Sequence, residues 1–209
     1  MSGLIFSLKT QPTFALDCSY LTPDKLAKLT INQIALLPLG QHINSPQVAD
    51  YFEFSGETSD TIIFDCSAEK LDFIGAKMQR GTIICKGNVG DRLGDQMRRG
   101  TILVDGNAGD YAASRMVAGT IAVFGSVGQY TAFGMRRGTV LLNQHATFHA
   151  TMQDCGEHTL GFLPILLKSF DAFDTRFKHI KPQPVHRFAG DLGVDGKGEI
   201  LVLNQEVLK

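Results

Sequence analysis

Apolar and polar positions recur along the middle of the chain with a period of 19 residues. The motif Gly-Thr-Ile or Gly-Thr-Val begins at Gly81, Gly100, Gly119 and Gly138, and a Met stands three residues before each Gly. A weaker leading copy starts at Thr61. A repeat of this regularity indicates a solenoid, in which each copy forms one coil and stacks on the next.

Within each copy, apolar residues alternate at a spacing of two, which places them on one face of a β-strand. The two columns that result are Ile83, Ile102, Ile121 and Val140, and then Cys85, Val104, Val123 and Leu142. A unit of 19 residues is too short for a helical hairpin repeat, which needs about 34. The pattern therefore predicts a mainly β fold, a short right-handed parallel β-helix with 19-residue coils.

The regions on either side of the repeat predict helices and capping strands. Residues 1–50 should hold a strand near the N-terminus and short helices, because Thr22-Pro23-Asp24 and Thr30 are good helix starts. Residues 51–150 hold the β-helix. Residues 151–209 should form an amphipathic helix and an extended tail, and we expect one structural domain overall.

The C-terminal helix is predicted over residues 161–178, where six apolar residues recur at helical spacing. The tail after it ends in Gly198-Glu199-Ile200-Leu201-Val202-Leu203, which suits a strand. Because the ends of a solenoid need a cover, this strand should cap the stack or pair with the N-terminal strand.

An apolar stripe is expected on the outside of the sheet. The residue between the two inward columns should face outward, yet it is apolar in every copy: Ile63, Ile84, Leu103, Ala122 and Leu141. Such a stripe needs a cover. The C-terminal helix is one candidate and a partner subunit is the other, so Ile84, Leu103 and Leu141 are candidate interface residues.

A column of arginines recurs in the same register. Arg80, Arg99 and Arg137 are its members, and the third coil breaks it with Val117-Ala118. Stacked like charges are unfavourable unless they meet carboxylates or a partner. One interpretation is a salt-bridge network, within the chain or between subunits, with Asp91, Asp95 and Asp110 as the candidate carboxylates. The other is an interface for an anionic ligand or an acidic subunit surface.

Composition excludes several other classes of function. The chain has 20 Lys plus Arg and 21 Asp plus Glu, a balance that favours neither nucleic acid nor an anionic membrane as partner. Its 4 Cys are far apart, and no apolar run approaches the roughly 20 residues that span a bilayer. With no signal peptide in view, we expect a cytoplasmic protein with reduced thiols.

A metal or catalytic site has one candidate cluster. His145, His149, Cys155 and His158 are of the types that bind zinc, and Cys155 with His158 is a local Cys/His pair. Zinc sites usually show tighter ligand pairs. We therefore expect no catalytic residue, no metal and no cofactor bound by this chain, and keep these four residues as a weaker alternative.

The repeat resembles the Gly-rich domain shared by the C subunit of formylmethanofuran dehydrogenase and the C-terminal part of the glutamate synthase large subunit. Three segments outside it make the resemblance more specific. Cys155-Gly156-Glu157-His158 with Phe162-Leu163-Pro164-Ile165-Leu166, and the tail over residues 190–201, are similar to the formylmethanofuran dehydrogenase subunit. Leu21-Thr22-Pro23-Asp24-Lys25-Leu26 resembles the C subunit of the bacterial formyltransferase/hydrolase complex.

The resemblance implies a non-catalytic structural subunit of such a complex in one-carbon metabolism, in which formyl groups pass from a tetrahydromethanopterin carrier to a furan-type carrier. The implied partners are amidohydrolase-like, formyltransferase and molybdoprotein-like subunits. Any molybdenum or tungsten pterin, or zinc, would belong to those partners. Two alternatives stay open: a glutamate-synthase-like β-helix spacer domain, and a subunit with its own Cys/His site.

Overall fold

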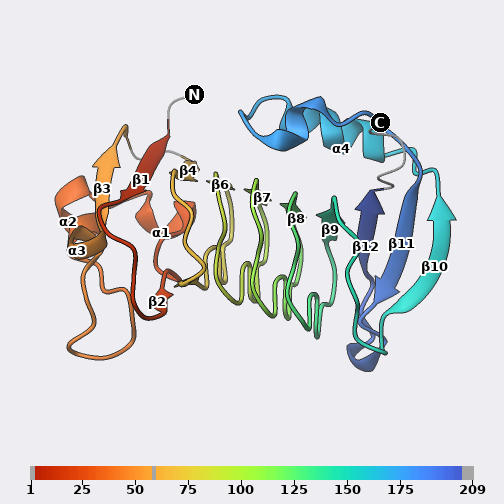
Figure 1. The fold of residues 1–209 in the computed structure, drawn as a ribbon, viewed down its shortest axis with the longest axis horizontal. Helices are drawn as coiled ribbons and strands as arrows, with labels where there is room; N and C mark the ends of the chain where they lie inside the picture. Colours follow the sequence, from red (N-terminus) through yellow and green to blue (C-terminus); the bar gives the residue numbers. More distant parts are fainter. Residues whose placement is uncertain (1–2, 58–59, 204–209) are drawn as a thin grey trace.

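The computed structural model describes residues 3–57 and 60–203. One ten-stranded sheet runs along it in the order β10-β11-β12-β9-β8-β7-β6-β4-β1-β3 (Figure 1). Its centre is a parallel stack of β4 (Thr61–Phe64), β6 (Thr82–Cys85), β7 (Thr101–Val104), β8 (Thr120–Val123) and β9 (Thr139–Leu142). The stack confirms the predicted mainly β fold and its parallel β-helix.

Side chains of one kind stack in register through the interior. Ile83 pairs with Ile102, and Ile102 with Ile121. The inward columns and the Met column are buried, none more than 1% exposed: Ile83, Ile102, Ile121, Val140, Cys85, Val104, Val123, Leu142, Met78, Met97, Met116 and Met135. Burying an aliphatic side chain of this size contributes about 1.5–3 kcal/mol. The interior of the stack is therefore the main source of its stability.

Glycine is required where each coil turns into its strand. Gly119 has a φ of +108°, a conformation that side-chain-bearing residues rarely adopt. A Cβ there would lie 2.8 Å from the carbonyl oxygen of Gly100 and 2.8 Å from Cε of Met97. The Gly and Met columns of the repeat therefore have one cause, a close approach between neighbouring coils.

Two polar ladders satisfy backbone N–H groups at the opposite turns. Oδ1 of Asp72 accepts the N–H of Asp91 at 2.9 Å, and Oδ1 of Asp91 accepts that of Asp110 at 2.8 Å. A second ladder runs beside it, because Oδ1 of Asn88 accepts the N–H of Asn107 at 2.9 Å. Each side chain therefore ties its own coil to the next one.

The N-terminal segment closes one end of the stack. β1 (Leu4–Leu8) lies parallel to β4 and antiparallel to β3 (Phe52–Ser55), while β2 (Leu16–Asp17) pairs with β5 (Leu71–Asp72). The short helices are α1 (Pro23–Leu26), α2 (Ile31–Ala35) and α3 (Val48–Tyr51). Thr22 and Thr30 are the N-caps of the first two, as predicted.

The C-terminal strands close the other end. β12 (Gly198–Leu203) lies parallel to β9, and β11 (Val185–Gly190) and β10 (Gln153–His158) continue the sheet in antiparallel fashion, with the turn η2 (Leu192–Val194) before β12. The predicted capping strand is confirmed. Pairing between the tail and the N-terminal strand is wrong, because β1 lies at the opposite end of the stack (Figure 1).

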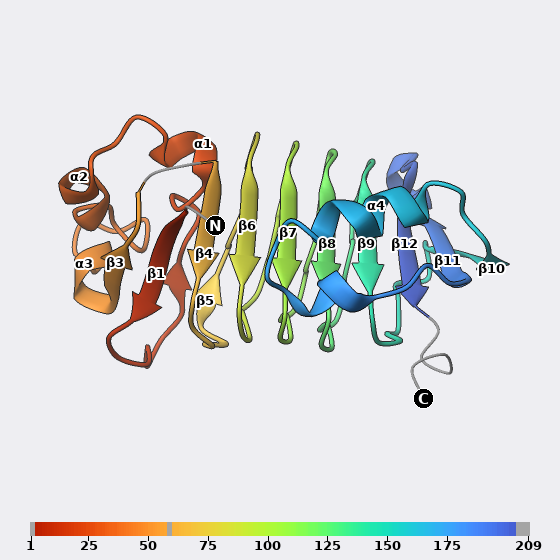
Figure 2. The same cartoon turned by 90° about the horizontal axis from the view of Figure 1, so that it is seen from above.

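The helix α4 (Leu163–Phe170) lies across the outer face of the sheet, over its C-terminal half (Figure 2). Its residues Leu163, Leu167 and Phe170 are buried in one cluster with three members of the outward stripe, Leu103, Ala122 and Leu141. Within residues 3–57 and 60–203, no helix has the length and apolar character needed to cross a bilayer.

This helix is shorter than the predicted 161–178 and is followed by the turn η1 (Arg176–His179). The chain bends after Phe170 because the segment behind it is tied to the coils. The N–H of Arg176 donates to Oδ1 of Asp105 at 2.8 Å, and the Arg176 guanidinium lies 3.7 Å from the Phe124 ring centroid. Lys86 pairs with Asp174 at 3.2 Å.

The Asp ladder predicts a measurable effect on stability. Asp91→Ala removes the acceptor for the Asp110 N–H and should lower the free energy of unfolding by about 1 kcal/mol. Urea denaturation measures the change. Glu53→Ala, an exposed carboxylate on β3, is the control and should change stability by less than about 0.5 kcal/mol. Equal effects of the two substitutions would contradict the ladder.

The packing of α4 on the sheet gives a second prediction, which compares a buried and an exposed position of this helix. Leu167→Ala should lower the free energy of unfolding by about 2–5 kcal/mol, because it leaves a cavity against the sheet. Ile165→Ala, at a position that is 73% exposed on the same helix, should cost less than about 0.5 kcal/mol beyond its small propensity effect. Thermal unfolding of both variants separates burial from helix propensity, and similar losses would show that α4 does not pack as described.

Candidate functional site

The outward apolar stripe is covered by the chain itself. Ile84, Leu103 and Leu141 are at most 1% exposed, and the last two pack in the cluster formed by α4 and η1. Of the two covers considered, the C-terminal helix is the one observed. We therefore correct the expectation that these three residues contact a partner subunit, because they have no exposed surface to offer it.

The arginine column, by contrast, is exposed. Arg80 lies 3.7 Å from Asp60, and both side chains are more than half exposed. Arg99 and Arg137 have no ion pair or side-chain hydrogen bond to any residue within 3–57 and 60–203, and the same holds for their neighbours Arg98 and Arg136. Four guanidinium groups on one surface are thus without a partner in the described part of the chain.

The carboxylates expected to neutralise this column are engaged elsewhere. Asp91 and Asp110 accept backbone N–H groups in the Asp ladder. Asp95 is buried, where it accepts hydrogen bonds from Ser114 and Arg115 at 2.7 Å each. The salt-bridge network expected within the chain is therefore not formed by these three carboxylates, because the ladder and the core contacts hold them away from the column.

The break in the column opens a hollow. Two adjoining depressions of about 730 Å³ and 420 Å³ share Arg98, Val117 and Arg136. The first adds Gln79, Arg99, Ala118 and Arg137, and the second adds Gln96, Arg115, Phe133, Gly134 and Val194. We call this combined surface the arginine hollow. It lies at the turns that lead into the strands, and its chemistry suits an anion that also carries an apolar group.

A second surface column escaped the sequence interpretation, although it has the same spacing of 19 residues. Phe73, Arg92, Tyr111, Tyr130 and His149 stack side by side. The Arg92 guanidinium lies 5.5 Å from the Phe73 ring centroid and 5.0 Å from that of Tyr111, whose ring stacks on Tyr130 at 5.0 Å. Comparison of every 19th residue would have found it. Its members are satisfied by one another, which indicates a structural role.

The four candidate metal ligands do not come together. His149 contacts Oγ1 of Thr151 at 2.9 Å, Nε2 of His158 lies 3.0 Å from the carbonyl oxygen of Cys155, and His145 packs against Phe188. Across the described residues, no group of three or more His, Cys, Asp or Glu side chains could hold a metal ion.

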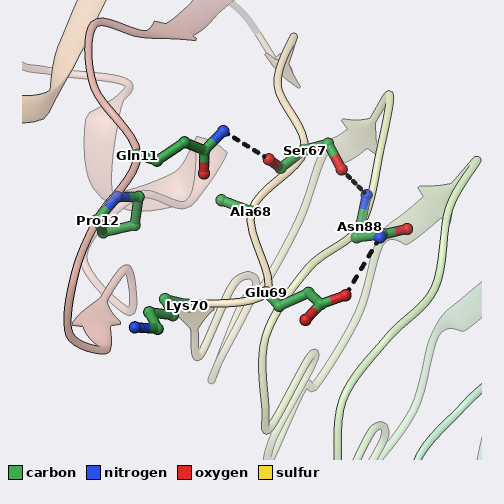
Figure 3. A pocket seen from close by; sticks show the side chains of 7 residues that line it. All are labelled: Gln11, Pro12, Ser67, Ala68, Glu69, Lys70 and Asn88. Atoms are coloured by element: carbon green, nitrogen blue, oxygen red, sulfur yellow. Dashed lines mark hydrogen bonds between the residues drawn. The ribbon is translucent and has the colours of Figure 1, made fainter.

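A smaller depression of about 310 Å³ lies where the N-terminal segment meets the first coils (Figure 3). Gln11 donates to the Ser67 carbonyl at 3.1 Å, and Oγ of Ser67 accepts the N–H of Asn88 at 3.0 Å. Asn88 in turn donates to Glu69 at 3.4 Å. Because these polar groups bind one another, the depression is a seam between segments rather than a site.

Comparison with known proteins finds similar chains in two enzyme complexes. No family model matches the chain. The C subunit of the tungsten-containing formylmethanofuran dehydrogenase 2 of Methanothermobacter thermautotrophicus is 33% identical over 94 residues, and its counterpart from Methanothermobacter wolfeii gives the same figures. The match covers 43% of this chain and spans 35% of those relatives.

A solved structure matches over nearly the full length. It is a chain of the formyltransferase/hydrolase complex (FhcABCD) from Methylorubrum extorquens in complex with methylofuran, with a TM-score of 0.53 and 26% identity. The match covers 96% of this chain and 99% of that chain. Together the two findings confirm the resemblance inferred from the repeat and its flanks.

The cysteines give a prediction that bears on the Cys/His alternative. Burial raises the pKa of the Cys66 thiol to about 12, and it also raises the pKa of the buried Cys18 and Cys85 thiols. At pH 8 roughly one Cys66 in ten thousand would be thiolate. Ellman's reagent should therefore label the half-buried Cys155 and leave the other three unlabelled until the chain unfolds. Cys155→Ser is the control and should abolish the native signal.

Proposed function

We propose that this homologue of the formylmethanofuran dehydrogenase C subunit is a structural subunit of a formyltransferase/hydrolase-type complex in one-carbon metabolism. The observation that carries the proposal is the full-length structural match, because it includes both end caps and the helix cover as well as the repeat. The match to the archaeal subunits reaches only 35% of their length, which favours the bacterial type of complex over the dehydrogenase.

A non-catalytic role agrees with the use the chain makes of its polar side chains. The Asp and Asn ladders hold coils together, Asp95 holds Arg115, and the aromatic column is packed against itself. The arginine hollow itself has no nucleophile or general base among its lining residues. We therefore propose that the formyl chemistry belongs to partner subunits.

The proposed partners are amidohydrolase-like, formyltransferase and molybdoprotein-like subunits, together with a furan-type formyl carrier handled by the complex. Any metal or pterin would be theirs. The free cysteines of the described residues, three of which lie in or against one core, support a reducing compartment, which we propose to be the cytoplasm.

Purification from the native organism tests this proposal. The tagged chain should co-elute with three or more other subunits in fixed ratio, and the assembly should transfer and hydrolyse formyl groups. A stable monomer as the only native form would contradict a subunit role. Recovery with glutamine-utilising partners would instead favour the glutamate-synthase-like spacer.

The same assembly tests whether the chain has its own site. Cys155→Ser together with His158→Ala should leave kcat within about twofold of the native complex, because both side chains contact backbone carbonyl oxygens and do not form a Cys/His pair. Collapse of turnover with assembly intact, measured by size-exclusion chromatography, would show that the Cys/His alternative is right.

A further inference from the structure

The third coil has Val117-Ala118 where its two neighbours have a pair of arginines, and it differs from them there only in its side chains. The N–H of Val117 donates to the carbonyl of Met97 at 2.8 Å, as the N–H of Arg98 does to Met78 and that of Arg136 does to Met116, at 2.9 and 2.8 Å. The backbone of the turn is therefore the same in all three coils. Since Val117 is 39% exposed, neither the core nor the turn requires an apolar residue there.

Every other arginine of the chain is engaged. Arg80, Arg115 and Arg187 pair with carboxylates, while Arg92 and Arg176 lie over aromatic rings. Within residues 3–57 and 60–203, the four that flank Val117 alone have neither kind of contact: Arg98, Arg99, Arg136 and Arg137. A concentrated positive charge with no internal neutralisation is suited to an external anion.

The layout of the hollow restricts what that anion can be. The two arginine pairs stand two coils apart, roughly 10 Å. Val117 lies on the coil between them, and the exposed Phe133 and Val194 extend the apolar lining on the side of Arg136, at 39%, 40% and 45% exposure. A single carboxylate or phosphate would reach one arginine pair only and would leave the apolar lining uncovered.

We propose that the arginine hollow docks an acidic, extended peptide segment of a partner subunit. Every second side chain of an extended chain lies on the same face, so carboxylates four residues apart, roughly 13 Å along the chain, reach both arginine pairs through the length of the arginine side chains. An apolar side chain between them rests on Val117. The inference rests on the proposed function only in requiring a partner subunit, and it names the surface through which that partner binds.

A photo-crosslinker at the centre of the hollow tests this directly. Val117→p-benzoylphenylalanine is placed in the tagged chain, the complex is purified from the native organism and irradiated, and the adduct is sequenced by mass spectrometry. The expected adduct is a partner segment with two or more Asp or Glu within three residues of the link. A link to a segment without acidic residues, a non-peptide adduct, or no link overturns the proposal.

Charge reversal supplies the matched control. Arg99→Glu with Arg137→Glu in the crosslinking chain should lower the adduct yield by about tenfold or more. Lys28→Glu with Lys178→Glu makes the same change in net charge at two exposed positions away from the hollow, and should keep the yield within about twofold. Equal yields from the two double variants overturn the proposal. Circular dichroism checks that both double variants are folded.

The outcomes separate this inference from the proposed function. If the tagged native chain recovers no partner subunit, the proposed function fails. If the partners are recovered with full formyl turnover but Val117 links to none of them, the proposed function stands and the docking proposal alone is overturned.

Discussion

The structure depends on close stacking of coils whose equivalent atoms lie 19 residues apart. The close approach at Gly119, the hydrogen bond from Asp110 to Asp91 and the stacking of Ile102 on Ile83 are all consequences of that one register. Each coil offers its neighbour an apolar column, a backbone ladder and a polar ladder at once. A shift of one residue would break all three, which is why register and composition are so tightly linked here.

Stacking in register also brings like charges close together, and the chain offsets their repulsion in several ways. The carboxylates of the Asp ladder accept N–H groups, Asp95 is paired within the core, and the Arg92 guanidinium is sandwiched between rings. The four arginines that flank Val117 have no such contact within the described residues. The turn makes the same backbone hydrogen bond with arginine or with valine, so the backbone does not dictate which of the two stands there.

Covering of the sheet decides which surfaces remain for partners. The outward stripe is apolar in every coil, and α4 with η1 buries its members Leu103, Ala122 and Leu141. β1 with β3 closes one end of the stack, and β12 with β11 and β10 closes the other. The part of the apolar face under α4 and η1 is therefore not accessible to another chain. The turns and the outer side of α4, where Phe162 and Ile165 are exposed, remain accessible.

The sequence by itself determined the period, the inward columns, the glycine turns and the helix starts at Thr22 and Thr30, because these are local or strictly periodic constraints. It also indicated that the tail caps the stack and that the helix near 161–178 could cover the stripe. Only the tertiary structure decided that the helix ends at Phe170, since the bend comes from Asp105 and Phe124, about 50 to 70 residues earlier. It likewise decided that Asp91, Asp95 and Asp110 bind other groups and so leave the arginines free, because competition for a carboxylate depends on which donors the fold brings closest.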